Sequence, residues 1–497
     1  MVCFTKKQVV ELSRKYNVIP VYREILSDLE TPMSAYLKID NPEYSFLLES
    51  VEGGENTARY SFLSRKPAGI IRYENGRIYS AIDGKKEEFE TSDPLGYMSG
   101  IFKKYKAAPV EGLPARGGAV GYIGYDIAKL YNKVPSGVKK DDLKWPDMFF
   151  MLTGVMMIFD HVYHKIKVMS CIFVRDGDKK KDIEAKYEKA VKTIDSIIRD
   201  IKKPFVPAAG EKRARRPLIR HHVKKEDFKE QVRKTVELIK NGEAIQVVLS
   251  QRFSAPYEGD PVNIYRCLRA VNPSPYMHFI RMGKKVIIGA SPEVMIKVEN
   301  RKAMVRPIAG TAKRGKTAEE DAVLEKKLLS DEKERAEHVM LIDLGRNDIG
   351  KVSKTGSVKI QDLMAVEKYS HVMHMVSNVT GMLSSGKDAL DAFAAAFPAG
   401  TVSGAPKVRA MQIIEEMEKT KRGPYSGAVG YISYGGVLDT CISLRTIYYD
   451  GNNKKAYMQA GAGIVADSNP EYEYKESLNK AEAVFKALRM AVERDEL

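Results

Sequence analysis

The N-terminal part of the chain has the hydrophobic pattern of short strands. Runs rich in β-branched and aromatic residues alternate with turn residues, which is typical of antiparallel sheets. We expect strands at 44–50, 59–64, 69–75, 76–83 and 165–174. Over 183–201 apolar residues instead recur every three or four positions and predict an amphipathic helix.

The C-terminal part mixes strand patterns with long helical patterns. We expect strands at 244–254, 285–291 and 456–465, and helices at 225–241, 319–347, 387–396, 405–420 and 471–493. Because strands and helices do not alternate strictly, this order favours an α+β fold with large antiparallel sheets over a doubly wound parallel sheet.

A basic segment marks the boundary between the two parts. Prolines and a glycine precede the run KRARRPLIRHHVKK, 212–225, where the amphipathic pattern stops. We therefore predict an N-terminal domain over 1–205, a solvated linker over 206–224 and a C-terminal domain over 225–497.

The composition is that of a soluble globular protein. The chain has 497 residues, of which 44% are hydrophobic and 29% charged. The longest apolar stretch, 148–159, is too short to span a membrane, and the N-terminus has no apolar signal segment. The four cysteines are scattered, which argues against a disulfide framework or a thiolate zinc site. We expect a cytoplasmic protein.

The positive charge does not by itself indicate nucleic-acid binding. The surplus of 81 Lys+Arg over 65 Asp+Glu gives +16, but the basic residues are mostly mixed with acidic ones. The one dense cluster, 212–225, lacks the aromatic residues on which bases stack. An RNA-binding protein remains a weak alternative, because acidic clusters elsewhere in the chain would repel phosphates.

Two predicted helices carry acidic faces that could hold a metal. Glu334 and Glu337 lie one turn apart, and Glu473, Glu476 and Lys480 share a face at i, i+3 and i+7. If the two faces meet, their carboxylates could bind Mg²⁺ and an anionic substrate. Charged helix faces are more often simply solvated, so these residues alone leave both interpretations open.

Three loops of small residues could bind carboxylates through backbone N–H groups. They are 306–311, 397–407, which leads into a helix, and 459–466. The last contains GxGxxA, but 467–470 separates it from the next helix, which argues against dinucleotide binding. Tight turns alone would also explain any one of these loops.

Single histidines and arginines offer further candidates. His371 and His374 lie in a strand-like run and point to opposite faces, so at most one is a catalytic base. Arg445 lies in an apolar strand, and its burial would cost several kcal/mol unless an anion pairs with it. That anion is either a protein carboxylate or a substrate.

Several of these segments occur together in one order. They include PIAGTxxRG, DExERAEH, DLGRNDIG, HVMH, FPAGTVSGAPK, RGPYSGAVGY, SLRT and QAGAGIVADSxPExEYxES. The C-terminal part closely resembles the chorismate-utilising enzymes, and LLESVEGGENTARYSF and GGAVGYIGYD resemble anthranilate synthase component I. The resemblance implies a β-sandwich with helices outside, an N-terminal regulatory domain and a C-terminal chorismate-binding domain.

Two positions separate the chemistries of this family. Isochorismate and salicylate synthases use a lysine where this chain has Gln246, and aminodeoxychorismate synthases carry one where it has Ala309. Without either lysine the nucleophile must come from outside, which fits ammonia. The resemblance thus implies an Mg²⁺-dependent lyase that converts chorismate and ammonia to anthranilate and pyruvate via aminodeoxyisochorismate. Aminodeoxychorismate synthase component I is the alternative.

The resemblance also implies roles for individual residues. Glu337 and Glu476 would bind Mg²⁺, with Glu334 and Glu473 supporting it through waters. Glu293 would protonate the departing hydroxyl, with its pKa raised by burial and by neighbouring carboxylates, and His374 would remove the C2 proton. Chorismate contacts are expected at Gly310, Thr311 (also a catalytic candidate), Tyr425, Arg445, Gly461, Ala462, Gly463 and Lys480.

Partners and regulation follow from the same resemblance. The chain shows no glutaminase motif, so we expect a separate glutamine amidotransferase subunit, component II, in a heterotetramer. Tryptophan would inhibit by binding a pocket formed by Glu49, Ser50, Pro275, Tyr276 and Met277. The alternative is that these residues are ordinary strand ends.

Overall fold

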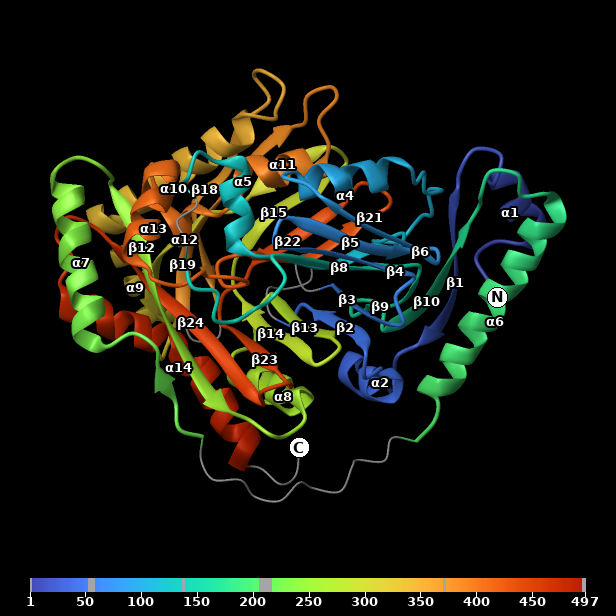
Figure 1. Cartoon of the computed structure of the whole chain (residues 1–497), viewed down its shortest axis with the longest axis horizontal. Helices are drawn as coiled ribbons and strands as arrows, with labels where there is room; N and C mark the ends of the chain where they lie inside the picture. Colours follow the sequence, from blue (N-terminus) through green and yellow to red (C-terminus); the bar gives the residue numbers. More distant parts are fainter. Residues whose placement is uncertain (1, 52–58, 136–138, 205–216, 370–371, 494–497) are drawn as a thin grey trace.

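The computed structural model describes residues 2–51, 59–135, 139–204, 217–369 and 372–493. Within these ranges the chain forms two large antiparallel sheets of 12 strands each, with helices around them (Figure 1). The predicted α+β class is therefore confirmed. His371 and most of the predicted linker lie outside the described residues.

The first sheet contains strands from both ends of the chain. Its order is β1 (Val18–Leu26), β10 (Lys165–Phe173), β9 (Val155–Asp160), β3 (Tyr60–Arg65), β2 (Tyr44–Glu49), β13 (Tyr276–Met282), β14 (Lys285–Ser291), β23 (Thr446–Asp450), β24 (Lys455–Ile464), β12 (Gln246–Pro256) and β11 (Arg220–His221). The short β20 (Gly404–Ala405) also pairs with β12.

The second sheet has the same mixed origin. Its order is β17 (Ile308–Lys313), β19 (Val372–Met382), β16 (Lys302–Val305), β15 (Val294–Glu299), β22 (Leu438–Ile442), β21 (Ala428–Ser433), β7 (Gly118–Ile123), β8 (Met148–Thr153), β4 (Gly69–Glu74), β5 (Arg77–Ile82) and β6 (Lys85–Glu90). The strand β18 (Lys359–Lys368) pairs with β19.

Strands from before and after the predicted linker join directly in both sheets. Strand β2 pairs with β13 from Tyr44 to Glu49, and β7 pairs with β21 from Gly118 to Ile123. The domain division remains a prediction, but each sheet is continuous across it. Within the predicted linker, Arg220 and His221 form β11 against the edge of β12.

The two sheets pack face to face through a shared apolar core. Phe46, Ile158 and Ile287 of the first sheet cluster with Tyr122 and Phe149 of the second, all of them buried. Alternation along each strand sends the remaining apolar residues to the outer faces, where helices cover them. The expected sandwich with helices outside is therefore confirmed.

The helices lie on the two outer faces. They are α1 (Lys6–Leu12), α2 (Pro32–Ile39), α4 (Pro94–Lys103), α5 (Ala128–Tyr131), α6 (Lys180–Ile201), α7 (Lys225–Lys240), α8 (Pro261–Val271), α9 (Ala318–Ser330), α10 (Glu332–Gly350), α11 (Ala389–Ala396), α12 (Gly400–Ser403), α13 (Lys407–Met417) and α14 (Pro470–Glu493). Helix α6 buries the predicted stripe, including Ile183, Ile194 and Ile198, against the first sheet.

The prediction of one helix over 319–347 is wrong, because α9 and α10 are separate. The break is at Asp331, whose backbone leaves the helical region at φ −71° and ψ 112°. Its carboxylate accepts hydrogen bonds from the backbone N–H groups of Lys333 and Glu334 and so caps α10. The cap fixes the start of the helix that carries Glu334 and Glu337.

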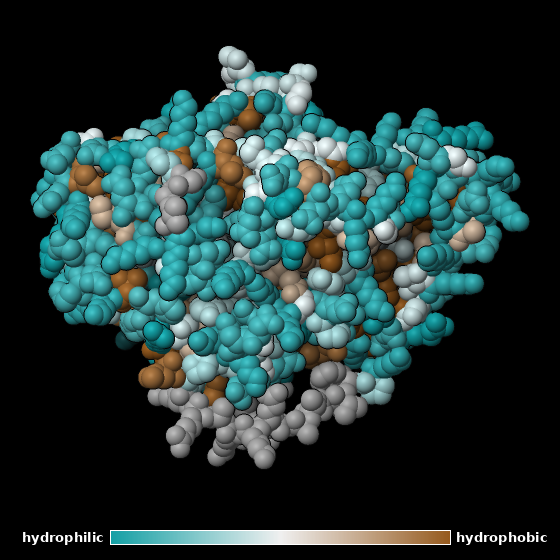
Figure 2. All heavy atoms as spheres, viewed as in Figure 1, coloured by the Kyte–Doolittle hydropathy of each residue, from teal (hydrophilic) through white to brown (hydrophobic). Residues whose placement is uncertain are grey.

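The visible surface is largely hydrophilic, with apolar side chains scattered over it (Figure 2). No helix in the described ranges is long and apolar enough to cross a membrane. In the described part of the chain, the four cysteines form no disulfide with one another.

Candidate active site

The two acidic helix faces meet in the structure. Lys333 of α10 forms an ion pair with Asp467, just before α14, at 2.9 Å. The pKa of Glu334 is raised by burial and by the negative charges of neighbours that include Glu337 on its own helix and Glu476 on α14. Carboxylates from separate helices therefore act on one another in a single cluster.

Each glutamate of this cluster has a defined place. Glu473 is buried and accepts a hydrogen bond from Ser468 at 2.8 Å, and burial raises its pKa. Glu476 pairs with Lys480 at 2.7 Å. Glu337 accepts a hydrogen bond from Gln246 Nε2 at 3.2 Å.

The cluster suits a hard divalent cation in charge and in ligand type. Mg²⁺ prefers carboxylate oxygens and usually keeps several waters, so few direct protein ligands suffice. In the described ranges, however, no three acidic, histidine or cysteine side chains converge closely enough to form a complete metal site by themselves. The glutamates fit a cation that would share its coordination with water or substrate.

Glu293 has the environment of a proton donor. It follows Ser291 and Pro292 at the turn from β14 to β15 and is buried. Its carboxylate accepts a hydrogen bond from the hydroxyl of Thr401 at 2.8 Å. Burial raises the pKa of Glu293 to about 8, although Thr401, Arg445 and Lys480 act in the opposite direction. The expectation that neighbouring carboxylates would contribute is not met.

Arg445 is a largely buried cation that no carboxylate of the described chain pairs with directly. It lies between β22 and β23 in a left-handed conformation, with φ +47°. Burial lowers the pKa of its guanidinium, and only the ionised form of Glu293 would act in the opposite direction. A buried unpaired guanidinium is unfavourable unless an anion reaches it. This arrangement favours a substrate anion as its partner.

His374 and Thr311 face each other across β17 and β19. The strands pair Thr311 with His374, and a bulge at Gly310, φ +73°, offsets the register. His374 Nδ1 lies 3.2 Å from the Gly310 carbonyl oxygen and 3.0 Å from the Thr311 hydroxyl. Because a carbonyl only accepts, a hydrogen bond to Gly310 requires the proton on Nδ1, and in that tautomer Nε2 keeps its lone pair. Burial also lowers the pKa of His374, which keeps the ring neutral.

The bulge connects the histidine to the acidic cluster. A Cβ added at Gly310 would lie 2.7 Å from Met375 Cε and 3.2 Å from a carboxylate oxygen of Glu334. The left-handed backbone favours glycine at this position, whereas the neighbouring side-chain ends could move to make room for a Cβ. The backbone conformation therefore explains why position 310 is a glycine, independently of any contact with substrate.

The AGAG segment lies in β24, opposite β12. Gly461 pairs with Ser250, Ala462 with Leu249 and Gly463 with Val248. A Cβ at Gly461 would come within 2.4 Å of the Leu249 carbonyl oxygen, and one at Gly463 within 2.7 Å of Gln246 Nε2.

Tyr425 is buried, and its ring lies 5.7 Å from the guanidinium of Arg422.

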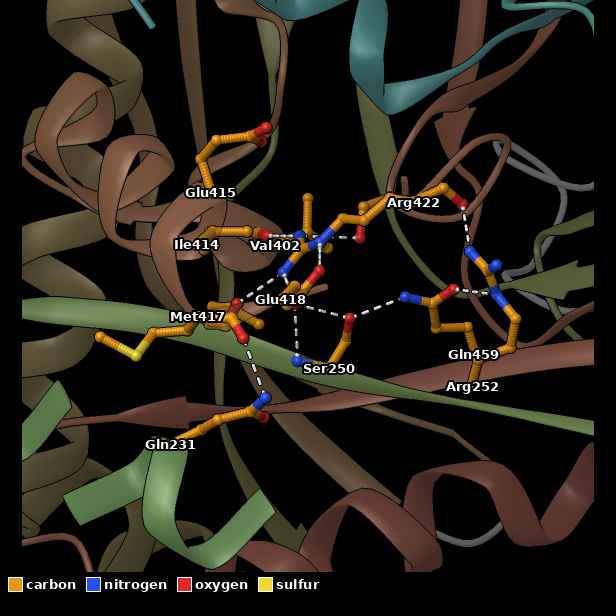
Figure 3. A network of polar contacts seen from close by, with 12 residues as sticks. Gln231, Ser250, Arg252, Val402, Ile414, Glu415, Met417, Glu418, Arg422 and Gln459 are labelled. Carbon is orange, nitrogen blue, oxygen red and sulfur yellow. Dashed lines mark hydrogen bonds and ion pairs between the residues drawn. The ribbon is translucent and has the colours of Figure 1, made fainter. Parts of the chain in front are cut away.

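Some residues of this site were missed in the sequence. Thr401 stood within the loop 397–407, but nothing in the pattern indicated that its hydroxyl reaches Glu293. The loop leads through α12 and β20 into α13. Arg422 stood within RGPYSGAVGY, and the structure places it in a buried polar network (Figure 3).

A cavity lies beside Glu293. Its lining includes Glu293, Arg306, Leu344, Asp348 and Thr401. Neither His374 nor Arg445 lines it. The cavity therefore lies where Glu293 meets α10 and α12.

The residues expected to bind tryptophan come from adjacent strands. Glu49 of β2 pairs with Met277 of β13, which follows Pro275 and Tyr276. The Glu49 carboxylate accepts from the Tyr265 hydroxyl at 2.5 Å and pairs with Arg269 at 3.3 Å. Met277 is buried in the core. Tyr276 donates to Asp439 at 3.0 Å.

Comparison with known proteins agrees with this geometry. The sequence model of the family described as chorismate binding enzyme matches residues 43–486. A protein named anthranilate synthase component 1 from Aquifex aeolicus is 48% identical over 99% of this chain and 98% of its own. Its counterpart from Acetivibrio thermocellus is 47% identical, over 98% of this chain and 99% of its own.

Solved structures show the same fold. Anthranilate synthase component I from Streptococcus pneumoniae superposes with a TM-score of 0.77 and 38% identity, over 93% of this chain and 99% of that one. The menaquinone-specific isochorismate synthase from Escherichia coli, 18% identical, superposes with a TM-score of 0.67 over 97% of this chain and 98% of its own. The chain thus belongs to the chorismate-binding enzyme family, within the group of anthranilate synthase component 1 proteins.

Proposed function

We propose that this chain converts chorismate and ammonia to anthranilate, pyruvate and water, as component I of an anthranilate synthase. One observation carries the proposal. The positive charge of one largely buried cation, Arg445, lowers the pKa of both the buried acid Glu293 and the base His374, so the three side chains lie within electrostatic reach of one another. Neither Gln246 nor Ala309 offers an amine, so the nitrogen must come from a second substrate.

Chorismate carries two carboxylates, which would match two cations of the site. Arg445 is buried without a direct ion pair in the described chain, and the second cation, Lys480, reaches the site from α14. A carboxylate bound to Arg445 would remove the cost of burying that guanidinium. The substrate would thereby be held between Glu293 and His374.

The first step is the addition of ammonia at C2 with loss of the C4 hydroxyl. Glu293 donates its proton to the departing oxygen, which leaves as water, while the ring double bonds shift and the C2–N bond forms. The raised pKa of Glu293, about 8, keeps the acid protonated at neutral pH. The product of this step is aminodeoxyisochorismate.

The second step is elimination of the enolpyruvyl group. His374 Nε2 takes the C2 proton, the C3–O bond breaks, and the released enolpyruvate becomes pyruvate. The bond from Nδ1 to the Gly310 carbonyl holds the ring in the tautomer that this step needs. Aromatisation to anthranilate drives the elimination.

The acidic cluster would hold Mg²⁺. Glu337 and Glu476 would be direct ligands, with Glu334 and Glu473 supporting them through water. Bound Mg²⁺ would supply positive charge for a substrate carboxylate. Gln246, which donates to Glu337, would orient that ligand.

The test is an assay of the purified chain with chorismate, Mg²⁺ and ammonium, followed by anthranilate fluorescence and pyruvate release. We expect both products in equal amounts. Formation of an aminodeoxychorismate without pyruvate would instead favour the alternative, aminodeoxychorismate synthase component I.

We also propose that ammonia reaches the chain from a glutamine amidotransferase subunit in a heteromeric complex. The support is that relatives covering the full chain are named as component 1. With glutamine in place of ammonium the pure chain should form no anthranilate until that subunit is added. Glutamine-dependent turnover by the chain alone would refute the proposal.

Feedback inhibition by tryptophan is the last part of the proposal. Glu49 and Pro275–Met277 lie at the adjoining ends of two paired strands, with Ser50 next in the chain. Ser50→Phe should block the site and abolish inhibition at tryptophan concentrations that inhibit the unmodified chain. Ser92→Phe, at an exposed loop position, is the control. Full sensitivity in Ser50→Phe would exclude this pocket.

A further inference from the structure

Arg422 is an arginine buried at 2% exposure with its guanidinium fully engaged (Figure 3). It pairs bidentately with Glu418, Nε to Oε2 at 2.9 Å and Nη2 to Oε1 at 2.6 Å. Nη1 donates to the Val402 carbonyl and Nη2 to the Val248 carbonyl, each at 2.7 Å. The ring of Tyr125 lies 4.6 Å from the guanidinium.

The network connects segments that line the site. Glu418 Oε1 also accepts from the backbone N–H and the hydroxyl of Ser250, at 2.9 and 2.8 Å. Ser250 lies on β12 opposite Gly461. The same ion pair therefore links β12, the end of α13 and the turn that contains Val402.

The bond to Val402 fixes the turn that carries Thr401. Val402 and Thr401 lie in the single-turn helix α12, whose N-terminal end has no side-chain cap. The last carbonyls of a helix have no partner within it, so they need an external donor. Arg422 supplies one to Val402, next to the residue whose hydroxyl contacts Glu293.

We propose that Arg422 is a positioning residue that, through the Val402 peptide, holds the Thr401 hydroxyl against Glu293 and so sets the proton affinity of that acid. The inference rests on the proposed role of Glu293. A hydrogen bond donated to a carboxylate favours the ionised form. Without a fixed donor the acid would hold its proton to higher pH.

Stability alone is a weak reason for this arrangement. A buried ion pair is often no more stabilising than apolar residues of similar volume, because both charges must leave water. Arg422 instead directs its donors at two backbone carbonyls on different segments. That geometry accounts for an arginine in place of an apolar side chain.

Other charged groups face Glu293 and act independently of Arg422. Arg445 and Lys480 lower the pKa of Glu293 through their charges. Arg306 and Asp348 line the adjoining cavity, but Arg306 is paired with Glu367 and Asp348 with Lys407. Variants of Arg422 leave all of these residues unchanged.

The test compares the pH dependence of Thr401→Val, Thr401→Ser, Arg422→Lys and the double variant Thr401→Val/Arg422→Lys. Arg409→Lys, in an ion-paired arginine partly exposed on α13, is the matched control. Two readouts are followed: kcat/KM for chorismate at constant free ammonia, and infrared titration of the Glu293 carboxylic C=O stretch, assigned by its loss in Glu293→Gln. The infrared readout needs no turnover, so failure of the proposed function leaves it interpretable.

We expect Thr401→Val to move the Glu293 titration to higher pH by about one unit, and Thr401→Ser and Arg409→Lys to leave it in place. Arg422→Lys cannot form the bidentate pair and both carbonyl contacts, and should shift it in the same direction. The double variant should shift no further than Thr401→Val, because both changes remove one interaction. The inference would be overturned if the Glu293 titration did not move in Arg422→Lys or in Thr401→Val. It would also be overturned if the shifts of the two single variants added up in the double variant.

Tyr125 offers a milder perturbation if Arg422→Lys does not fold. Tyr125→Leu removes the ring beneath the guanidinium and should shift the titration upward. Tyr125→Phe keeps that ring and removes only a hydroxyl without a hydrogen-bond partner in the described chain, so it should not. A folded Tyr125→Leu with the wild-type titration would overturn the inference.

Discussion

The environment of Glu293 turns an ordinary carboxyl group into an acid that works at neutral pH. Burial raises its pKa to about 8. Because the proposed reaction uses the protonated form, the acid is available below that pKa and is lost as the pH rises through it. The group should therefore set the alkaline limit of activity.

We expect kcat/KM for chorismate to decline above about pH 8 when free ammonia is held constant. Glu293→Gln should lower the rate by roughly 10²–10⁴-fold, the usual worth of general acid help, and abolish that alkaline limb. Glu299→Gln, an exposed carboxylate at the end of β15, is the control. An unchanged limb in Glu293→Gln would show that another group titrates there.

A second residue-scale prediction concerns the base. With the proton on Nδ1, as a hydrogen bond to the Gly310 carbonyl requires, Nε2 of His374 is the ring nitrogen that can accept one. His374→Ala should therefore stop the elimination but permit the addition, so that aminodeoxyisochorismate accumulates and anthranilate does not. Chromatography with mass detection measures both. The control His221→Ala changes an exposed histidine and should behave as the unmodified chain.

At this scale the sequence indicates residue types better than contacts. Glu293, His374 and Arg445 could be identified from their motifs. The bond from Thr401 to Glu293 joins positions 108 residues apart, and no local pattern predicts it. Likewise, the sequence drew attention to Gln246 only because related enzymes carry a lysine at that position. The structure adds that Gln246 donates a hydrogen bond to Glu337.

Helices and strands were predicted well where one period dominates. The expected helix 225–241 corresponds to α7, and the expected strand 285–291 to β14. The prediction failed over 319–347, because the helical pattern continues on both sides of Asp331. The signal for the break was present, since Asp331 and Glu334 have the spacing of a capping box.

The cap at Asp331 gives an element-scale prediction. Asp331→Ala leaves two N–H groups of α10 without their acceptor and should destabilise the protein by about 1 kcal/mol. Since the first turn carries Glu334, we also expect a higher Mg²⁺ concentration for half-maximal activity. Thermal unfolding and Mg²⁺ titration measure the two effects. Asp331→Asn keeps a hydrogen-bond acceptor without the charge, so its stability and its Mg²⁺ requirement should both be close to those of the unmodified chain. Equal impairment in the two variants would mean that charge, not capping, matters.

The whole molecule is organised differently from the sequence. The basic run and the change in pattern divide the chain in two, yet both sheets cross that division through β2–β13 and β7–β21. Such pairings between distant strands depend on the packing of the complete sandwich, and local periodicity contains no information about them. The sequence therefore predicted the class of sheet but not which strands share it.

This organisation predicts that the C-terminal part cannot fold by itself. A fragment beginning at Lys225 would leave β13 and β21 as unpaired edges and would uncover the core that Tyr122, Phe149 and Ile158 fill. Long apolar edges promote aggregation, so we expect an insoluble or loosely packed fragment. Co-expression with residues 1–224 should restore a soluble complex that unfolds in one cooperative transition by calorimetry, as the full chain does. A monodisperse fragment 225–497 with its own sharp transition would mean that the sheets can close without the N-terminal strands.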